Sequence, residues 1–274
     1  MAPPTHLTVA TFNLLAPCYK RMSPAVVTAA PGTAVGGPGG SAHPYPDRPT
    51  ASTPWASRPR RPREGDAPHL WRPRLAALID ELASLQPPPD ILCLQEWWFA
   101  SAYADALTAA LEGTYVLTTA RRPGKDDGLA IGVRRPLGVA AAASWRLVDG
   151  DDRVALLVAV EAGPPPPPLP VGIDGGGVGG SATAAAPVVV VVNTHLTFPH
   201  GVGDGVMRLQ QVSALTEVVD GWVDEAPGRE GAPVLIVGDF NGEASDAVAA
   251  HLVARDYVNS WEAGVTAGGR VVAW

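Results

Sequence analysis

Short apolar segments alternate along this chain with segments whose apolar residues recur at the spacing of one helix face. Residues 71–85 show the helical pattern, with large aliphatic residues at 75, 78, 79, 82 and 85 and a proline run at 87–89 that ends it. Residues 90–96 then form a short apolar run, which is typical of a strand buried on both faces. Because this alternation continues along most of the chain, we expect a layered α/β fold rather than an all-α or all-β one.

The same two patterns place the other elements of this fold. Alternation over residues 7–15 predicts a first strand that ends at Asn13, and the same pattern with β-branched residues predicts strands at 115–119, 129–133, 153–161, 188–192, 234–237 and 257–261. Helical spacing predicts helices at 101–111, 207–219 and 246–254. Ser245 is the expected N-cap of the last helix, and Asp127 with Gly128 is expected to form the turn before the strand at 129–133.

Two long stretches of low complexity interrupt the alternation. Residues 23–68 are rich in Pro, Gly, Ala, Ser and Arg, and residues 162–187 hold a proline run followed by Gly and Ala. Both carry too few large apolar residues to offset the entropy of ordering the chain, so we expect them to be insertions. They explain why the composition is skewed towards 30 Gly and 29 Pro. We therefore expect one domain over residues 1–274 with two insertions.

The net charge of the chain limits how it can bind nucleic acid. A net charge of −7 and a pI near 5.3 disfavour a protein that grips nucleic acid through a broad basic face, but allow an enzyme that touches only a few phosphates. The N-terminus lacks the pattern of a secretory signal, and no segment approaches the roughly 20 apolar residues of a membrane span. We expect a soluble intracellular protein, in the cytoplasm or alternatively in an organelle, whose oligomeric state the sequence leaves open.

Polar residues stand at the ends of four of the predicted buried strands. They are Asn13, Glu96, His195 and the pair Asp239 and Asn241. A polar group that ends an apolar strand is costly to bury unless it finds partners or a ligand. Since ligands collect where the strands of α/β sheets end, we expect these side chains to converge on one site.

The residue types in this polar set favour one kind of chemistry. Mg²⁺ binds through one or two carboxylates plus waters and substrate oxygens, an amide can orient a water, and an imidazole can stabilise or protonate a phosphate oxygen. Zinc would recruit more histidines or cysteines. Taken singly, each residue could equally be a turn residue, a solvated strand end or a hydrogen-bonded core histidine. Taken together, their order and spacing predict phosphoryl transfer assisted by Mg²⁺, with Mn²⁺ as an alternative ion.

Six ordered motifs carry a resemblance to a known family. They are Thr-Phe-Asn-Leu-Leu-Ala at 11–16, Trp-Arg-Pro-Arg at 71–74, Leu-Gln-Glu at 94–96, Asn-Thr-His-Leu at 193–196, Arg-Leu-Gln-Gln at 208–211 and Gly-Asp-Phe-Asn at 238–241. In this order they resemble the endonuclease/exonuclease/phosphatase superfamily, and within it the branch of the carbon-catabolite-repressor deadenylases, nocturnin and their plant and algal relatives. The resemblance covers nearly the whole chain outside the two insertions.

The resemblance implies a fold and a role for each member of the polar set. The implied fold is a four-layer sandwich, in which two mixed β-sheets pack face to face with helices outside. Glu96 is implied as the principal Mg²⁺ ligand, with Asn13 in support. Asp239 and Asn241 would orient the nucleophilic water or hold a second metal. His195 would contact the scissile phosphate.

Three further residues are candidates for binding substrate. Arg153 could contact phosphate, and Asp127 could lie at the mouth of the site. Arg208 could support the site electrostatically, or it could have a surface or structural role. Residues 18–21 could contact a substrate backbone or form a solvated loop.

One part of the family pattern is absent from this sequence. Members end with a strand carrying an Asp and then a Ser-Asp-His motif, whereas residues 269–274 read Gly-Arg-Val-Val-Ala-Trp. We therefore expect that the last strands are missing, through an incomplete gene model or in a pseudoenzyme, and that the chain as given does not turn over substrate.

Three functions are compatible with these observations. The first is a Mg²⁺-dependent phosphodiesterase, and within that class a 3′–5′ exonuclease acting on the 3′ end of RNA, as deadenylases do. The second is a phosphatase or lipid phosphodiesterase acting on a small phosphorylated substrate, which the acidic balance favours. The third is an inactive fragment or pseudoenzyme.

Overall fold

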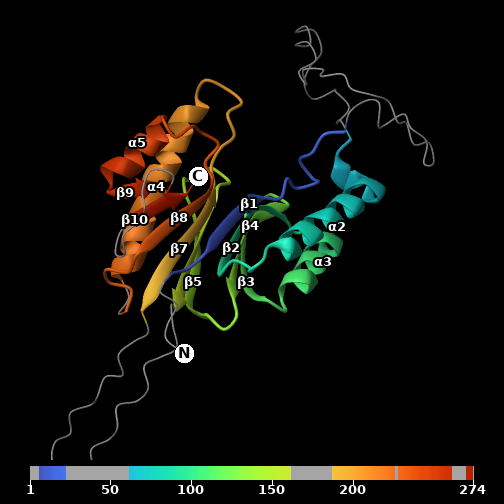
Figure 1. Cartoon of the computed structure of the whole chain (residues 1–274). Coiled ribbons are helices and arrows are strands. Elements are labelled where there is room, and N and C mark those ends of the chain that lie inside the picture. Colours follow the sequence, from blue (N-terminus) through green and yellow to red (C-terminus); the bar gives the residue numbers. More distant parts are fainter. Residues whose placement is uncertain (1–5, 23–61, 162–186, 226–227, 261–269, 274) are drawn as a thin grey trace, which may run out of the picture.

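Two β-sheets stand face to face in this computed structural model, which describes residues 6–22, 62–161, 187–225, 228–260 and 270–273 (Figure 1). The smaller sheet has the strand order β1-β2-β4-β3, and the larger has the order β5-β6-β7-β8-β10-β9. The strands are β1 (Val9–Asn13), β2 (Ile91–Trp98), β3 (Tyr115–Arg121), β4 (Asp127–Arg134), β5 (Gly138–Arg146), β6 (Val154–Glu161), β7 (Val188–His195), β8 (Val234–Asp239), β9 (Tyr257–Asn259) and β10 (Arg270–Ala273). The helices are η2 (Glu64–Asp66), α2 (Pro68–Ser84), α3 (Ser101–Leu111), α4 (Asp204–Asp224) and α5 (Ala247–Ala254).

Both sheets mix parallel and antiparallel pairs. In the smaller sheet β1 runs parallel to β2, and β4 is antiparallel to β2 and β3. In the larger sheet β7, β8, β10 and β9 form parallel pairs, while β5 and β6 add on in antiparallel fashion. The predicted α/β fold with two mixed sheets is confirmed. The parallel pairs also bring the carboxyl ends of β1 and β2 together in one sheet, and those of β7 and β8 together in the other.

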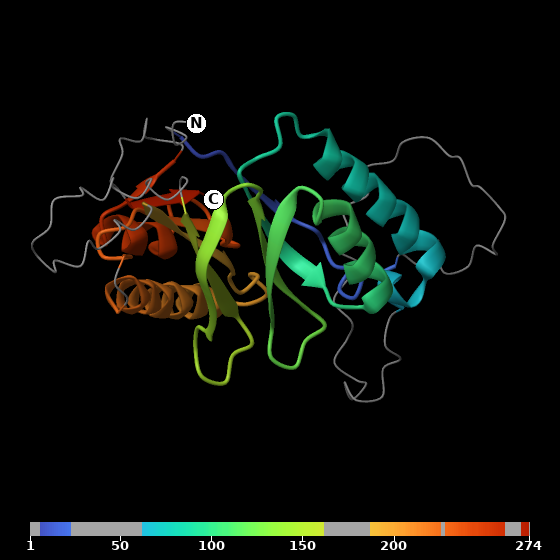
Figure 2. The ribbon, with the colours of Figure 1, turned by 90° about the horizontal axis from the view of Figure 1, so that it is seen from below.

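Three apolar layers separate the sheets and helices, which gives the four-layer order visible in Figure 2. Ile91 and Cys93 of β2 face the core between the two sheets, whereas Leu92 and Leu94 face the core beneath α2 and α3. The third core lies between the larger sheet and helices α4 and α5. Successive residues of β2 thus serve two cores, as predicted for a strand buried on both faces. No helix among the described residues has the length and apolar content needed to cross a bilayer.

Two local predictions are wrong. Asp127 and Gly128 belong to β4 rather than to a turn, and a Cβ on Gly128 would lie 2.0 Å from the carbonyl oxygen of Ala120 on β3. The glycine is therefore there to let two strands approach closely. Asp246, not Ser245, caps α5, because its carboxylate accepts hydrogen bonds from the first free backbone N–H groups of that helix.

Element boundaries also differ from the prediction. Residues 62–68, predicted to belong to the first insertion, instead include η2 and the start of α2, and η2 places a buried Glu64 against Arg74 and Lys20. The remainder of that insertion and residues 162–186 lie outside the described residues. Neither β5 nor β10 was predicted, and β5 is rich in alanine, a weak strand former. The last predicted strand is shorter than expected, ending at residue 259.

Candidate active site

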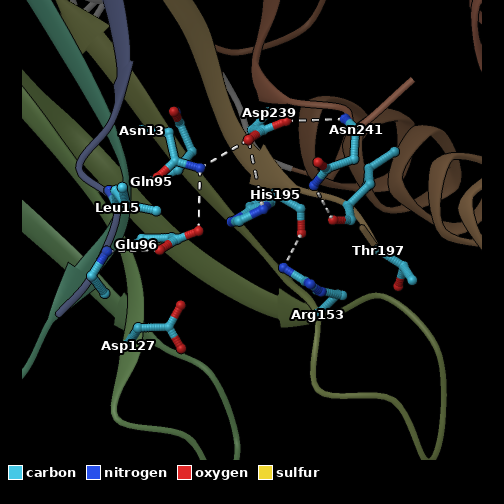
Figure 3. Close-up of polar contacts among 12 residues, drawn as sticks. Asn13, Leu15, Gln95, Glu96, Asp127, Arg153, His195, Thr197, Asp239 and Asn241 are labelled. Carbon is cyan, nitrogen blue, oxygen red and sulfur yellow. Dashed lines mark hydrogen bonds and ion pairs between the residues drawn. The ribbon is translucent and has the colours of Figure 1, made fainter. Parts of the chain in front are cut away.

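The polar residues at the four strand ends lie together at one edge of the two sheets (Figure 3). The amide Nδ2 of Asn13 donates hydrogen bonds to Asp239 Oδ2 at 2.8 Å and to Glu96 Oε1 at 3.3 Å. Glu96 belongs to the smaller sheet and Asp239 to the larger. One amide therefore holds together two carboxylates that come from different sheets.

A bulge in β2 directs Glu96 into this cluster. The pairing of β2 with β4 shifts between Gln95 and Trp97, and Glu96 has a φ of 56°. In a regular strand Glu96 would point with Leu94 into the core beneath the helices, and the extra residue turns it away from there. Its Oε2 then accepts a hydrogen bond of 2.7 Å from the backbone N–H of Ala16. Burial raises the pKa of the Glu96 carboxyl, against these hydrogen bonds, and the neighbouring acidic groups raise it further.

The turn after β8 fixes the orientation of Asp239. The backbone N–H of Asn241 donates to Asp239 Oδ1 at 3.0 Å, and the Asn241 side chain donates to the carbonyl of Leu196 at 2.9 Å. Asn241 has a φ of 51°, a conformation that Asn tolerates better than most residues. Gly238 has a φ of 149°, and a Cβ there would lie 2.0 Å from the carbonyl oxygen of Thr194. The glycine therefore allows β8 to lie against β7 at this point.

His195 is buried beside Asp239 and carries no charge at neutral pH. Its Nε2 lies 3.8 Å from Asp239 Oδ2, and its Nδ1 has no hydrogen-bond partner among the described residues. Burial lowers the pKa of the imidazole to about 3, and the Arg153 guanidinium adds to this effect. Arg153 in turn donates to the backbone carbonyl of His195 at 3.2 Å. This position allows Arg153 to support the histidine as well as to meet a phosphate.

Asp127 has a different place from the one expected at the mouth of the site. Its side chain is fully buried and accepts a 2.6 Å hydrogen bond from the Tyr19 hydroxyl. Arg122 donates to both Asp127 oxygens at 3.1 and 3.2 Å, and it also pairs with Asp152. The Asp127 carboxylate has no exposed surface, which favours a role in holding Tyr19 and Arg122 over direct contact with a substrate. Sequence reasoning missed this network because its members look like charged loop residues.

Arg208 contacts the segment that follows β7 and is not among the residues that line the two cavities at the cluster. Its Nη1 is 3.5 Å from the carbonyl of Thr197, and its Nη2 is 3.9 Å from Asp246. Gln211, one helical turn further along α4, accepts a 3.0 Å hydrogen bond from the Thr197 N–H. These contacts hold the segment that follows β7, which favours the structural role considered for Arg208.

Two buried amides that were not singled out join the sheets beneath the site. Gln95 donates to Asn193 Oδ1 at 2.8 Å and to Thr11 Oγ1 at 2.9 Å. Asn193 then donates to the carbonyls of Leu94 and Ala130 at 3.0 Å each. Polar groups this deep in an apolar interface are tolerated only when their hydrogen bonds are made, so these bonds fix the register of the two sheets.

Two cavities meet at the cluster. The first has a volume of about 620 Å³ and is lined in part by Glu96, His195 and Arg153. The second has a volume of about 540 Å³ and is lined in part by Gln95, Phe240 and Glu243. Asn13, Phe198, Asp239 and Asn241 line both cavities. A molecule that spanned the two would pass directly over Asn13 and Asp239.

The donor set fits a hard cation such as Mg²⁺. Nowhere in the described part of the chain do three Asp, Glu, His or Cys side chains gather as a complete ligand set. Magnesium does not need one, since it keeps several waters and takes one or two carboxylates from the protein. Glu96 and Asp239 supply two carboxylates bridged by the Asn13 amide. Glu96 and Asp239 would be the ligands, and Asn13, whose Nδ2 donates to both carboxylates and whose Oδ1 accepts from the Leu15 N–H, would orient them.

Some known proteins are similar to this chain in sequence, and others in fold. A curated protein of Arabidopsis thaliana, described as an uncharacterized calcium-binding protein, is 26% identical over 264 residues, which is 94% of this chain and 44% of that protein. The chain thus spans less than half the length of this curated relative. The human nocturnin catalytic domain with bound sulfate has a TM-score of 0.50 and 21% identity, covering 68% of this chain and 63% of that one. ANGEL2, a 2′,3′-cyclic phosphatase, in complex with adenosine-2′,3′-vanadate, has a TM-score of 0.50 and 22% identity, covering 65% and 47%.

The structural likeness at these identities shows a shared fold, and the family match extends over nearly the whole chain. The model of the endonuclease/exonuclease/phosphatase family matches residues 11–272, a range that contains every member of the polar cluster. This chain therefore belongs to the endonuclease/exonuclease/phosphatase family.

Proposed function

We propose that this chain carries the catalytic site of a Mg²⁺-dependent phosphodiesterase, and that its substrate is the 3′ end of RNA. The observation that carries the proposal is the pair of carboxylates, Glu96 and Asp239, bridged by the Asn13 amide where two cavities meet. A bound Mg²⁺ would neutralise charge that develops on the phosphate oxygens. The shape of the site suits a diester, since one organic group can lie on each side of the cluster.

The chain's own residues would position the phosphate and the water. His195 is neutral, so an N–H of its ring can donate a hydrogen bond to a phosphate oxygen. A charged imidazolium at this place would bind the phosphate product more tightly. Asp239 is fixed through both oxygens, by Asn13 and by the Asn241 N–H, which orients it for a hydrogen bond to the attacking water. Arg153 would hold the backbone of His195 in place and bring positive charge to the same cavity.

The preference for RNA rests on the order of motifs and on phosphate-like ligands in relatives. The nocturnin structure holds a sulfate, and the ANGEL2 structure holds an adenosine vanadate. ANGEL2 is named as a 2′,3′-cyclic phosphatase, which supports a phosphatase acting on a nucleotide end as the second candidate. Both functions use the same cluster, and they differ in which bond to phosphorus is cleaved.

One preparation tested against several substrates separates these functions. Hydrolysis in Mg²⁺ would be measured on oligoadenylate, a 2′,3′-cyclic nucleotide end, phosphoinositides, sphingomyelin and dinucleotide cofactors. In a full-length protein that contains this chain, we expect oligoadenylate to be shortened from its 3′ end, and we expect Glu96→Gln to abolish this. Glu81→Gln, an exposed change of the same kind on α2, is the control. Activity retained in Glu96→Gln would overturn the assignment, and Mg²⁺ binding without turnover of any substrate would support a non-catalytic protein.

A further inference from the structure

The two cavities at the cluster differ in charge. The cavity on the Glu96 side is lined by Arg21, Arg63, Arg122 and Arg153, together with the cluster itself. The cavity on the other side has no Lys or Arg among the residues that line it, and it includes the acidic Glu243. A substrate that crossed the cluster would therefore meet positive charge on one side only.

The four arginines of the first cavity are not equivalent. Arg122 is committed to Asp127 and Asp152, and Arg153 lies 3.7 Å from Asp152. Within the described part of the chain, no carboxylate lies at ion-pair distance from Arg21 or Arg63. Arg63 donates one hydrogen bond, from Nη1 to the backbone carbonyl of Tyr19 at 2.8 Å. Among the described residues, its remaining N–H groups and the whole Arg21 guanidinium have no hydrogen-bond partner and are left for another one.

Backbone hydrogen bonds hold Arg21 and Arg63 side by side. The two residues form an antiparallel β-bridge. The N–H of Met22 donates to Pro62 at 3.2 Å, and the N–H of Glu64 donates to Lys20 at 2.9 Å. Two cations placed next to each other repel, and an anion between them converts that repulsion into two charge-assisted hydrogen bonds.

We propose that Arg21 and Arg63 form a subsite for a second phosphate group of the substrate, on the Glu96 side of the bond that is cleaved. This subsite rests on the proposed function and adds the orientation in which the substrate lies across the cluster. The phosphate-bearing part of the substrate lies along the arginine-lined cavity, and the uncharged part lies in the cavity of Phe240 and Glu243. The second phosphate could be the next diester of an oligonucleotide or the terminal phosphate of a dinucleotide, which share this chemistry.

Binding without metal tests the subsite apart from catalysis. Fluorescein-labelled oligoadenylate would be titrated with wild type, Arg21→Ala and Arg21→Ala/Arg63→Ala in EDTA, with fluorescence anisotropy as the readout. We expect the double variant to bind about 10- to 100-fold more weakly, and the slope of log affinity against log salt to fall in magnitude by about 0.7 per lost phosphate contact. Arg72→Ala/Arg135→Ala changes two exposed arginines outside the cavity and should match wild type. Arg21 is exposed, so its single variant keeps the test valid if the double variant unfolds. Equal binding by wild type and both variants, or no binding by wild type, overturns the subsite.

Hydrolysis then separates this inference from the proposed function. The ratio of kcat/KM for oligoadenylate to kcat/KM for bis(p-nitrophenyl) phosphate, which has no second phosphate, should fall about 10- to 100-fold in Arg21→Ala/Arg63→Ala. A dinucleotide would also be tested with and without its terminal phosphate. If the two arginines bind that terminal phosphate, the ratio of kcat/KM with it to kcat/KM without it should fall in Arg21→Ala/Arg63→Ala. If they bind the next diester of an oligonucleotide, only the ratio measured with oligoadenylate should fall. If neither ratio changes while the wild type hydrolyses diesters, the subsite is overturned and the proposed function stands. If the wild type hydrolyses no diester but the double variant still binds oligoadenylate more weakly than wild type in EDTA, the proposed function fails and the subsite stands.

Discussion

Replacing Asp127 with Asn should destabilise the protein by about 3 kcal/mol, because it removes one charge from a buried pair. Asp127 has no exposed surface and accepts hydrogen bonds from Arg122 and Tyr19. Breaking a buried ion pair by removing one partner costs about 3 to 5 kcal/mol. We expect the lower end, since Asp152 still pairs with Arg122 and Asn keeps one oxygen as an acceptor. This loss is a large share of the roughly 5 to 15 kcal/mol that stabilises a domain.

Urea unfolding followed by tryptophan fluorescence measures this loss. With a slope of about 3 kcal/mol per M for a domain of this size, the midpoint should fall by about 1 M. The neighbouring Asp126 provides the control, because its side chain is 72% exposed and pairs with an Arg121 that is 54% exposed. Asp126→Asn should change the free energy of unfolding by no more than about 0.5 kcal/mol. Equal effects of the two substitutions would refute the argument that burial makes the Asp127 pair important.

Three other substitutions test the packing of β8 on β7 and the stability of the protein in acid. Gly238→Ala should prevent folding or lower the free energy of unfolding by more than about 3 kcal/mol, because its Cβ would lie 2.0 Å from a carbonyl oxygen of β7. Gly221→Ala, in α4 with no atom within 4 Å of the added Cβ, should instead raise it by up to about 1 kcal/mol, and equal outcomes by urea unfolding would count against the close packing of β8 on β7. Burial alone would raise the pKa of Asp90, but hydrogen bonds from Thr8 and from Arg134 lower it below the usual range. A carboxyl whose pKa is lower in the folded state contributes stability that is full above its unfolded pKa of about 3.9 and is lost as the pH falls below it. Asp90→Asn should therefore flatten the loss of stability as the pH falls below about 4, and an unchanged acid limb in urea titrations would contradict this.

The strand ends could be located from sequence because several independent patterns agreed on them. The apolar run before Glu96 and the valines before His195 are long enough to be buried strands, and each is followed at once by a polar group. Parallel pairing then places the carboxyl ends together within each sheet, so the meeting of Asn13 with Glu96 in one sheet and of His195 with Asp239 in the other follows from strand direction. The layered α/β class followed from the same alternation.

Features that depend on tertiary contacts were beyond the sequence patterns. The β2 bulge at Glu96 has no glycine to mark it, and it is set by pairing with β4. The segment containing Arg122 and Asp127 has the composition of a solvated turn, and its burial depends on contacts with Tyr19 and Asp152, which are distant in sequence. Strand β5 was missed because alanine carries little strand preference, and its place is fixed by pairing with β6.

Metal binding at Glu96 is the most direct test of the account. Mn²⁺ would be titrated into the protein, and free Mn²⁺ would be followed by electron paramagnetic resonance, with Mg²⁺ added afterwards as a competitor. We expect wild type to bind Mn²⁺ and release it to Mg²⁺, and Glu96→Gln to bind at least about 10-fold more weakly, because a principal carboxylate ligand is lost. Glu81→Gln should bind as wild type does. Equal Mn²⁺ affinity in wild type and Glu96→Gln would contradict the assignment of Glu96, Asn13 and Asp239 as the metal centre.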